Sequence, residues 1–266
     1  MTPRVLILRT AGTNCDRELA AGFRLAGGEP EVVHLNRVLA EPSILDQADI
    51  LALPGGFSYG DDIAAGRIFA TRLTHDLRAP LERLVTRGVP ILGICNGFQV
   101  LVKAGLLPDP SAWTQQVSLV DTRRGRFDTR WVDLEAPADS RCIWTRGLPP
   151  RFLMPAANAE GRFVAPPEVL AALEANGQVA LRYAVGTAGA EGNGSDGNIA
   201  GICDASGRVF GLMPHPERDV QPGGAPGSAR SGDTGTPIGL RVLRAAVEHV
   251  REARVSAPRA VGAAGT

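Results

Sequence analysis

The first hundred residues alternate between short apolar runs and segments whose apolar residues recur at helical spacing. Short apolar runs bounded by turns predict buried strands, and the segments between them predict crossover helices. The predicted strands cover residues 5–8, 31–35, 50–53 and 89–94, and the predicted helices cover residues 15–25 and 74–87. Strands joined by right-handed crossovers form an open, doubly wound parallel sheet, so we expect an α/β fold.

The second half of the chain shows a different pattern, in which short predicted strands are separated by turn-rich segments. These strands cover residues 117–119, 130–134, 179–183, 199–203 and 209–213. We expect them to add antiparallel strands, which makes the sheet a mixed one. The prediction is a single domain over residues 1–266, with its core at about 4–253, a last helix at 238–254 and a frayed tail at 254–266.

The composition excludes several classes of partner. The chain of 266 residues contains 28 Lys plus Arg and 28 Asp plus Glu, so its formal net charge is zero. Such a chain lacks the basic field that attracts nucleic acid or an anionic membrane, and we expect small molecules or proteins as partners. No run of residues approaches the roughly 18 apolar residues of a membrane-spanning helix, so we expect a cytoplasmic protein.

The residues that would form a nucleotide or metal site lack the necessary spacing. Lys103 is the only lysine, and its neighbours do not match a phosphate-binding loop. The G-x-G-x-x-G pattern at residues 192–197 precedes a predicted strand instead of a helix, so we interpret it as a flexible turn. It lies within one of two segments rich in small residues, 186–197 and 221–237, which predict mobile loops. The cysteines and histidines show no metal-ligand pattern, and we expect no metal or cofactor in this chain.

Cys95 is the strongest candidate for a nucleophile. It lies between the buried predicted strand 89–94 and an almost wholly apolar predicted helix at 98–107, and so occupies a sharp strand-to-helix turn. Gly93 and Gly97 stand two residues away on either side, as crowding at a strained nucleophile elbow requires. The free N–H groups of a helix N-terminus favour the thiolate form of a cysteine placed there. A cysteine that merely packs is the alternative, and the elbow alone leaves the two interpretations nearly balanced.

His215 is the histidine best placed to act with Cys95. It follows the predicted strand 209–213, and Glu217 stands two residues later, where its carboxylate can orient the imidazole and stabilise its charged form. A loop histidine beside a surface acid is the alternative, and it would be preferred if Cys95 were absent. The remaining histidines lie at the end of a predicted strand or in predicted helices: His34, His75 and His249.

A glycine loop after the predicted strand 50–53 opens at the same edge of the sheet as Cys95. Its two glycines, Gly55 and Gly56, permit backbone amides to approach a substrate closely. Together with the amide of Asn96, the loop can form an oxyanion hole for a tetrahedral intermediate. A plain turn is the alternative interpretation of such a glycine pair.

Four segments carry a resemblance to a known family. G-I-C-N-G-F-Q at residues 93–99 and M-P-H-P-E-R at residues 213–218 resemble the two signature segments of the class I, triad-type glutamine amidotransferases. G-T-N-C-D-R-E at residues 12–18 and P-G-G-F-S-Y-G-D at residues 54–61 are similar, more narrowly, to the glutaminase subunits of phosphoribosylformylglycinamidine synthases. The resemblance covers roughly residues 4–253 and implies the flavodoxin-like, mixed-sheet domain of that class.

The resemblance implies that the chain hydrolyses L-glutamine to glutamate and ammonia. Cys95 would attack the side-chain amide and form a thioester, which water would later hydrolyse. His215 would carry the proton to the departing ammonia, and Glu217 would orient His215. These are the roles that the residues themselves suggest without naming the substrate.

The same resemblance implies the remaining contacts and partners. The amides of Gly56 and Asn96 would bind the oxyanion, and Gln99 would help to bind glutamine. The family passes ammonia to a separate, larger synthetase subunit, often with a third, small subunit, in purine biosynthesis. ATP and Mg²⁺ are then expected in that partner, and neither nucleic acid nor a membrane is expected as one.

One segment departs from the family pattern. Where the family commonly reads H-G-E-G, residues 158–161 read N-A-E-G, so that Asn158 stands in place of a histidine outside the triad. We expect hydrolysis to survive this change, while the part that the histidine plays in glutamine contact or partner signalling becomes doubtful.

Cys15 is a second candidate thiol, because it also begins a predicted helix after a strand. It has no neighbouring base in the sequence, and we interpret it as structural, although a contact with a base from elsewhere in the chain stays open. Two alternatives to the functional interpretation also stay open. One is an amidotransferase subunit of another synthetase, and the other is a non-catalytic binding module with the same fold.

Overall fold

The computed structural model describes residues 1–61, 64–123, 125–184, 193–224, 226 and 235–256. The end of the predicted tail, and parts of the two segments predicted to be mobile loops, lie outside these residues. Among the helices that are described, none is long and apolar enough to cross a membrane.

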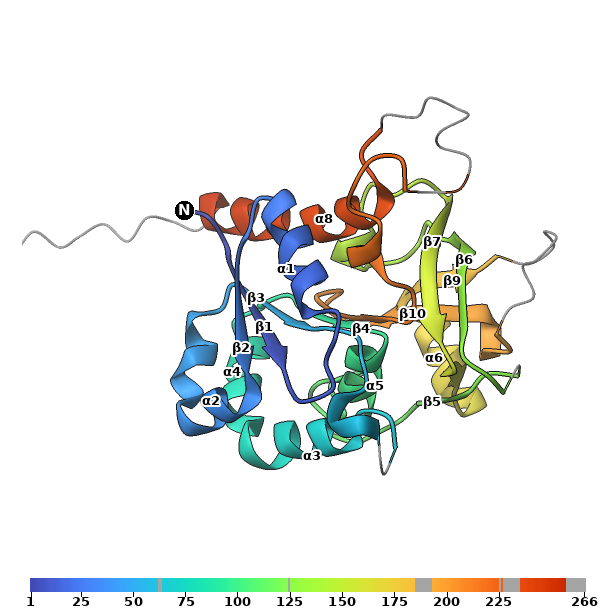
Figure 1. The fold of residues 1–266 in the computed structure, drawn as a ribbon. Helices are drawn as coiled ribbons and strands as arrows, with labels where there is room; N and C mark the ends of the chain where they lie inside the picture. The colour runs from blue at the N-terminus through green and yellow to red at the C-terminus, as the bar shows by residue number, and fades with distance from the viewer. Residues whose placement is uncertain (62–63, 124, 185–192, 225, 227–234, 257–266) are drawn as a thin grey trace, which may run out of the picture.

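A nine-stranded mixed sheet forms the centre of the molecule, in the order β2-β1-β3-β4-β11-β10-β9-β6-β7 (Figure 1). Its parallel strands are β1 (Arg4–Arg9), β2 (Glu29–His34), β3 (Ile50–Leu53), β4 (Ile91–Ile94) and β11 (Val209–Leu212). Antiparallel strands continue it: β10 (Ile199–Cys203), β9 (Val179–Tyr183), β6 (Asp128–Glu135) and β7 (Arg151–Asn158). A separate two-stranded sheet pairs β5 (Ser118–Asp121) with β8 (Glu160–Val164). The predicted doubly wound mixed sheet is confirmed. Two of the strands expected to extend it as antiparallel strands behave differently, because β11 pairs in parallel with β4 and β5 lies in the separate sheet.

Helices cover both faces of the parallel strands (Figure 1). One face carries α1 (Asp16–Leu25) and α8 (Ile238–Ser256), and the opposite face carries α3 (Arg67–Asp76), α4 (Arg78–Thr86) and α5 (Asn96–Lys103). Strands β3, β4 and β11 are buried along their whole length, as parallel strands between two helical layers must be. α8 continues past the predicted end at residue 254 to Ser256, so the start of the predicted frayed tail is helical.

The predicted helix at residues 74–87 corresponds mainly to α4, but its predicted start and continuity are wrong, because α3 and α4 are separated by a break at Leu77. Leu77 has a φ of −122°, outside the helical range. The reason is Pro80, whose ring would clash with the carbonyl of residue 76 in a continuous helix. Restarting the helix at Arg78 places Pro80 in a first turn, where its missing N–H leaves no bond unmade.

The elements without a predicted counterpart include α2 (Leu35–Ala40), α6 (Pro167–Ala175), β7 and β8, and most of α3 precedes the predicted helix. The predicted strand at residues 31–35 ends at His34, which caps α2 by accepting a hydrogen bond from the Asn36 amide on Nδ1 (3.2 Å). β7 carries Pro155, and proline is tolerated in a sheet mainly on an edge strand, which is where β7 lies. This edge strand matters for the site, because one of its carbonyl groups holds His215.

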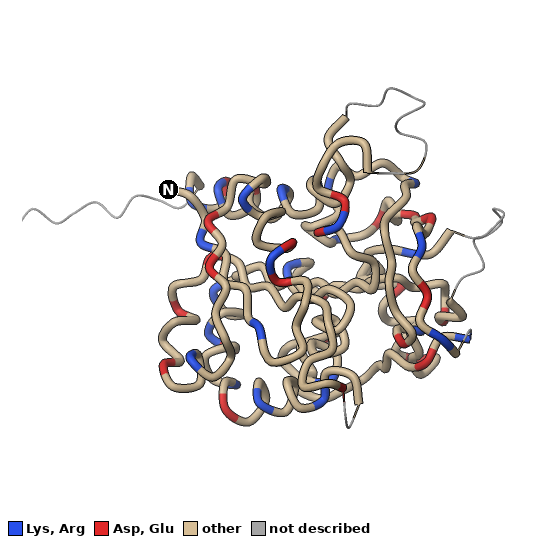
Figure 2. Tube along the Cα trace, viewed as in Figure 1, with Lys and Arg blue, Asp and Glu red and all other residues tan. Residues whose placement is uncertain are grey.

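Charged residues of both signs are interspersed over the part of the chain that is drawn in colour (Figure 2). Several of them form exposed ion pairs within one helix, such as Arg72 with Asp76 and Arg78 with Glu82. Exposed pairs of this kind contribute at most about 1 kcal/mol each. The exposed charges therefore keep the surface solvated and contribute little to the stability of the fold.

Candidate active site

Cys95 occupies the turn between β4 and α5, at the carboxyl edge of the parallel strands. Its φ of 51° lies in a region that residues with a side chain rarely adopt, so the backbone is strained at this position. A Cβ on Gly93 would stand 2.6 Å from the Gly97 carbonyl oxygen, and one on Gly97 would stand 2.0 Å from the Leu53 carbonyl oxygen. The predicted need for glycine on both sides of the elbow is therefore confirmed.

The Cys95 thiol faces a cavity. The Cys95 amide donates a hydrogen bond to the Leu212 carbonyl (2.8 Å), which ties the elbow to β11. The residue is 8% exposed and lines a cavity of about 200 Å³, and its Sγ lies 3.9 Å from the Ala157 carbonyl oxygen. The sulfur is therefore close-packed yet reachable from the cavity.

His215 is held by its backbone and by its side chain. Its amide donates a hydrogen bond to the Pro155 carbonyl of β7 (2.7 Å). Its Nδ1 lies 2.6 Å from Oε1 of Glu217, and both side chains are buried. A carboxylate that accepts the Nδ1 proton fixes the ring orientation and directs Nε2 away from the acid.

Cys95 and His215 come together across Gly55. A Cβ placed on Gly55 would stand 3.0 Å from Cε1 of His215 and 3.5 Å from Cβ of Cys95, and both residues line the same cavity. Nε2 of His215 is buried without a hydrogen-bond partner in the described part of the chain. The three residues predicted as nucleophile, base and orienting acid thus lie together, although their sequence positions are far apart.

The surroundings of His215 favour its charged form. Burial lowers the pKa of His215, but the charge of Glu217 and the thiols of Cys95 and Cys15 raise it, and the resulting pKa is well above the usual 6.5. The raised pKa favours the doubly protonated imidazole. A protonated ring beside a sulfur can donate that proton to a leaving group.

The two amides predicted for an oxyanion hole lie at the same edge. Gly56 has a φ of 138°, and a Cβ there would stand 2.7 Å from the Asn14 amide nitrogen. The short pairing beside it uses the amides of Asn14 and Phe57, which leaves the Gly56 amide outside the pairing. Asn96 is the first residue of α5, so its amide has no partner within the helix.

A family model described as a CobB/CobQ-like glutamine amidotransferase domain matches residues 2–250. The chain belongs to this glutamine amidotransferase family. It is 41% identical over 256 residues to the Dehalococcoides mccartyi protein named phosphoribosylformylglycinamidine synthase subunit PurQ, covering 94% of this chain and 98% of that one. It is also 41% identical to the protein of the same name from Archaeoglobus fulgidus, covering 81% of this chain and 87% of the relative.

Solved structures agree with this assignment. The structure described as PurLQS from Thermotoga maritima contains a chain that matches with a TM-score of 0.72 and 32% identity, over 94% of this chain and 100% of that one. A second structure, a glutamine amidotransferase from the same organism, matches with a TM-score of 0.56 and 17% identity over 95% and 99% of the two chains. The second likeness shows the shared fold alone.

In this amidotransferase, Gln99 lies one helical turn after Cys95 and lines the same cavity. Its Nε2 donates to Oε2 of Glu160 (3.1 Å), and its Oε1 accepts from Nδ2 of Asn96 (3.3 Å). Burial raises the pKa of the Glu160 carboxyl, which the nearby Lys103 partly offsets. The family resemblance predicts Gln99 at the site, whereas Glu160 was not predicted there.

Two further residues border the amidotransferase site: Cys15, which was interpreted as structural from the sequence, and Arg218, which was not singled out. Cys15 and Arg218 line the cavity, and Nη2 of Arg218 donates to Sγ of Cys15 (3.3 Å). The base missing from the sequence neighbourhood of Cys15 is His215, which the fold brings beside it. Arg218 could have been predicted, because it follows Glu217 directly in the second signature segment.

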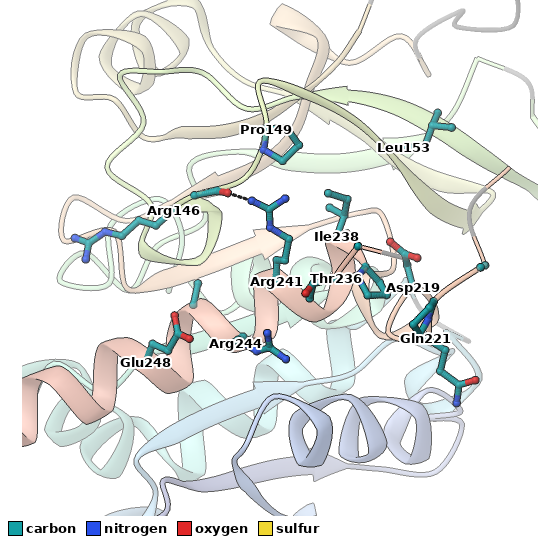
Figure 3. A pocket seen from close by; sticks show the side chains of 17 residues that line it. Arg146, Pro149, Leu153, Asp219, Gln221, Thr236, Ile238, Arg241, Arg244 and Glu248 are labelled. Atoms are coloured by element: carbon teal, nitrogen blue, oxygen red, sulfur yellow. Dashed lines mark hydrogen bonds between the residues drawn. The ribbon is translucent and has the colours of Figure 1, made fainter. Parts of the chain in front are cut away.

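Three other features of the amidotransferase were candidates for a functional role. A larger cavity of about 720 Å³ lies along the first half of α8, where Arg146, Arg241 and Arg244 line it, and none of the predicted site residues borders it (Figure 3). The described end of the G-x-G-x-x-G segment leads into β10, so this part precedes a strand as predicted.

Asn158, which stands where the family commonly has a histidine, lines the cavity that contains Cys95 and His215. Its Nδ2 donates a hydrogen bond to the Glu160 carbonyl.

Proposed function

We propose that this chain is the glutaminase subunit of a phosphoribosylformylglycinamidine synthase. It hydrolyses L-glutamine to glutamate and ammonia and delivers the ammonia to a larger synthetase subunit. The observation that carries the proposal is the meeting of Cys95 and His215 at one cavity, in a chain whose relatives bear that synthase's name. The 32% identity to a chain of PurLQS supports assembly with a larger subunit.

The first half of the reaction forms a thioester. The sulfur of Cys95, whose proton resides on His215, bonds to the side-chain carbonyl carbon of glutamine, and the carbonyl electron pair moves onto oxygen. The amides of Gly56 and Asn96 stabilise this oxyanion, and one such donor contributes about 3 kcal/mol elsewhere. Nε2 of His215 then gives its proton to the amide nitrogen, the C–N bond breaks and ammonia leaves.

The second half releases glutamate. Nε2 of His215, now without its proton, accepts one from water as the water oxygen bonds to the thioester carbon. The C–S bond breaks, glutamate leaves, and the pair of Cys95 and protonated His215 is restored. Glu217 keeps the ring oriented through Nδ1 in both halves, since its Oε1 lies 2.6 Å from that atom.

The cavity suits an amino-acid substrate. Its volume of about 200 Å³ admits a molecule of that size. Its lining contains the guanidinium of Arg218 and the carboxyl groups of Asp61 and Glu160. An amino acid carries one carboxylate and one ammonium, so groups of both signs can bind its ends while the side-chain amide reaches Cys95.

The remaining parts of the proposal concern the partners. Phe57 and Phe127 are exposed by 47% and 52%, line the cavity and lie with their ring centroids 6.3 Å apart. Exposed aromatic side chains beside a site are typical of a surface that a protein partner covers, here the synthetase subunit. ATP and Mg²⁺ act in that subunit, a third small subunit completes the assembly, and the complex works in the cytoplasm.

The test measures two activities of the assembled synthase. With Cys95→Ala, we expect glutamine-dependent synthesis of phosphoribosylformylglycinamidine to be lost, while synthesis from added ammonia persists. The matched control is Cys203→Ala, which removes a buried thiol that does not border the cavity and should leave both activities in place.

Three outcomes would contradict the proposal. If glutamine-dependent synthesis survives Cys95→Ala, the reaction does not pass through a thioester on Cys95. If the wild-type chain hydrolyses glutamine but supplies ammonia only to another synthetase, the proposed partner is wrong. A chain that binds the synthetase without any turnover of glutamine would be a non-catalytic module.

A further inference from the structure

Cys15 differs from the other cysteines in its surroundings. All four cysteines are free and buried, and three of them, Cys95, Cys142 and Cys203, belong to the apolar core. Cys15 is equally buried but lies outside the contiguous apolar cluster that the other three join. Its thiol donates to Oδ1 of Asn14 (3.1 Å) and accepts from Nη2 of Arg218 (3.3 Å). A buried sulfur with two polar partners at a cavity is not placed there by apolar packing.

A role at the start of α1 does not explain Cys15 either. It occupies the N-cap position, where a polar side chain normally bonds a free amide of the first turn, but its thiol makes no such bond. Instead its own amide donates to the Gly55 carbonyl (3.3 Å). Gly55 is the residue against which Cys95 and His215 meet, so the loop that carries Cys15 is fastened to the site itself.

The sulfur of Cys15 lies beside His215. Sγ of Cys15, a ring nitrogen of His215 and a carboxylate oxygen of Glu217 all lie within 4.8 Å of one another. A Cβ on Gly55 would stand 3.4 Å from Sγ of Cys15 and 3.0 Å from Cε1 of His215. The imidazole therefore has one thiol as the attacking group, Cys95, and a second thiol as part of its surroundings.

We infer that Cys15, itself held by Arg218, is a positioning residue that keeps the His215 ring directed at Cys95. Glu217 fixes one ring nitrogen and the Pro155 carbonyl fixes the backbone, but neither prevents the ring from tilting about Nδ1. Cys15 restricts this tilt from the side of α1. A misplaced catalytic group costs up to about 100-fold in rate, so the restriction affects turnover.

The position of Cys15 beside His215 has an electrostatic consequence that can be measured. The groups that face His215 are Glu217 from its own segment, Cys95 from the elbow and Cys15 from the start of α1, with Arg218 behind Cys15. Burial lowers the pKa of His215, and the contact with Cys15 is among the causes that raise it. Removing the sulfur should therefore lower that pKa, while a purely structural cysteine would leave it unchanged.

The experiment follows the His215 ring by NMR in isotope-labelled protein, its signal assigned by its loss in His215→Asn. In Cys15→Ala we expect the ring to lose its second proton at lower pH than in wild type. Cys15→Ser, which keeps a group that can bond Arg218, should titrate closer to wild type. Cys142→Ala is the matched control and should titrate as wild type. If Cys15→Ala does not fold, Cys15→Val, which also removes the sulfur but fills more of its volume, carries the same comparison.

Activity provides the second readout, and this part rests on the proposed function. In the assembled synthase, Cys15→Ala should lower kcat for glutamine about 10- to 100-fold with a smaller change in KM, and the alkaline limb of the pH profile should move to lower pH. Identical titrations and identical kcat values in wild type and Cys15→Ala would overturn the inference. A wild-type synthase that ignores glutamine would overturn the proposed function instead, and the NMR titration would still decide the inference.

Discussion

The elbow at Cys95 and the segment at His215 reach the same cavity but are held by different kinds of structure. The elbow consists of a few consecutive residues between β4 and α5, and its sharp turn depends on the strained backbone of Cys95, which has a φ of 51°. The His215 segment has no comparable strain among its described residues. It is fixed instead by the carbonyl of Pro155, on a distant edge strand, and by the buried carboxylate of Glu217.

The difference separates two ways of holding a reactive group. A strained turn is maintained by close packing, because Gly93 and Gly97 leave no room for a side chain. A histidine held by hydrogen bonds is maintained by polar partners, and its charge state depends on them. Changes in backbone volume should therefore damage the elbow, whereas changes in charge should damage the histidine segment.

The largest effect is expected from removing the imidazole. His215→Ala should lower the glutaminase kcat by roughly 10⁴- to 10⁶-fold, because the nitrogen that carries the proton to the leaving amide is lost. The measurement is ammonia release by the synthase under saturating glutamine. The matched control is His249→Ala, since His249 lies in α8 outside the cavity. Retention of even a tenth of the activity would show that His215 is not the proton carrier.

A backbone change at the elbow should have the next largest effect. Gly97→Ala places a Cβ 2.0 Å from the Leu53 carbonyl oxygen, so β3 and α5 must separate. We expect the free energy of unfolding to fall by about 2–4 kcal/mol, although alanine favours a helix by about 1 kcal/mol over glycine. Denaturant unfolding measures this.

The control for the elbow is Gly147→Ala, at a turn where an added Cβ meets no atom within 4 Å. Its φ of 69° makes alanine unfavourable, so a loss of only about 1 kcal/mol is expected. Equal losses in the two variants would mean that the close approach of Gly97 to β3 does not limit the stability of the elbow.

The same difference explains what the sequence could predict. Strands such as β3 and β4 are short apolar runs buried on both faces, and their local pattern is sufficient to find them. β7 carries Pro155 within an edge strand, where tertiary pairing overrides the local signal against a strand. The break at Leu77 was missed because Pro80 was included in a helix that it cannot continue.

The residues of the site also differ in whether the local sequence could predict them. Cys95 lies in a turn that its neighbours specify, and His215 with Glu217 lies in one short segment, so all three could be placed at strand ends in advance. The contact between Cys15 and His215 has no local pattern, because it depends on α1 and η5 (Pro216–Arg218) packing together. Their pairing is a property of the fold, and the structure was needed to find it.

The smallest of these effects is expected from removing only the charge of Glu217, which tests whether the His215 segment depends on charge. Glu217→Gln keeps an oxygen that can accept the Nδ1 proton of His215 but removes the charge that opposes burial. The pKa of His215 should therefore fall, so the ring loses its second proton at lower pH. The alkaline limb of kcat/KM should move to lower pH, with a loss of about 10- to 100-fold near pH 8 and a smaller loss near pH 6. A pH profile of the synthase measures this, with Glu82→Gln, at an exposed ion pair, as the control. A uniform loss at every pH, with the limb unmoved, would mean that Glu217 holds the ring by geometry alone, and the histidine segment would then resemble the elbow.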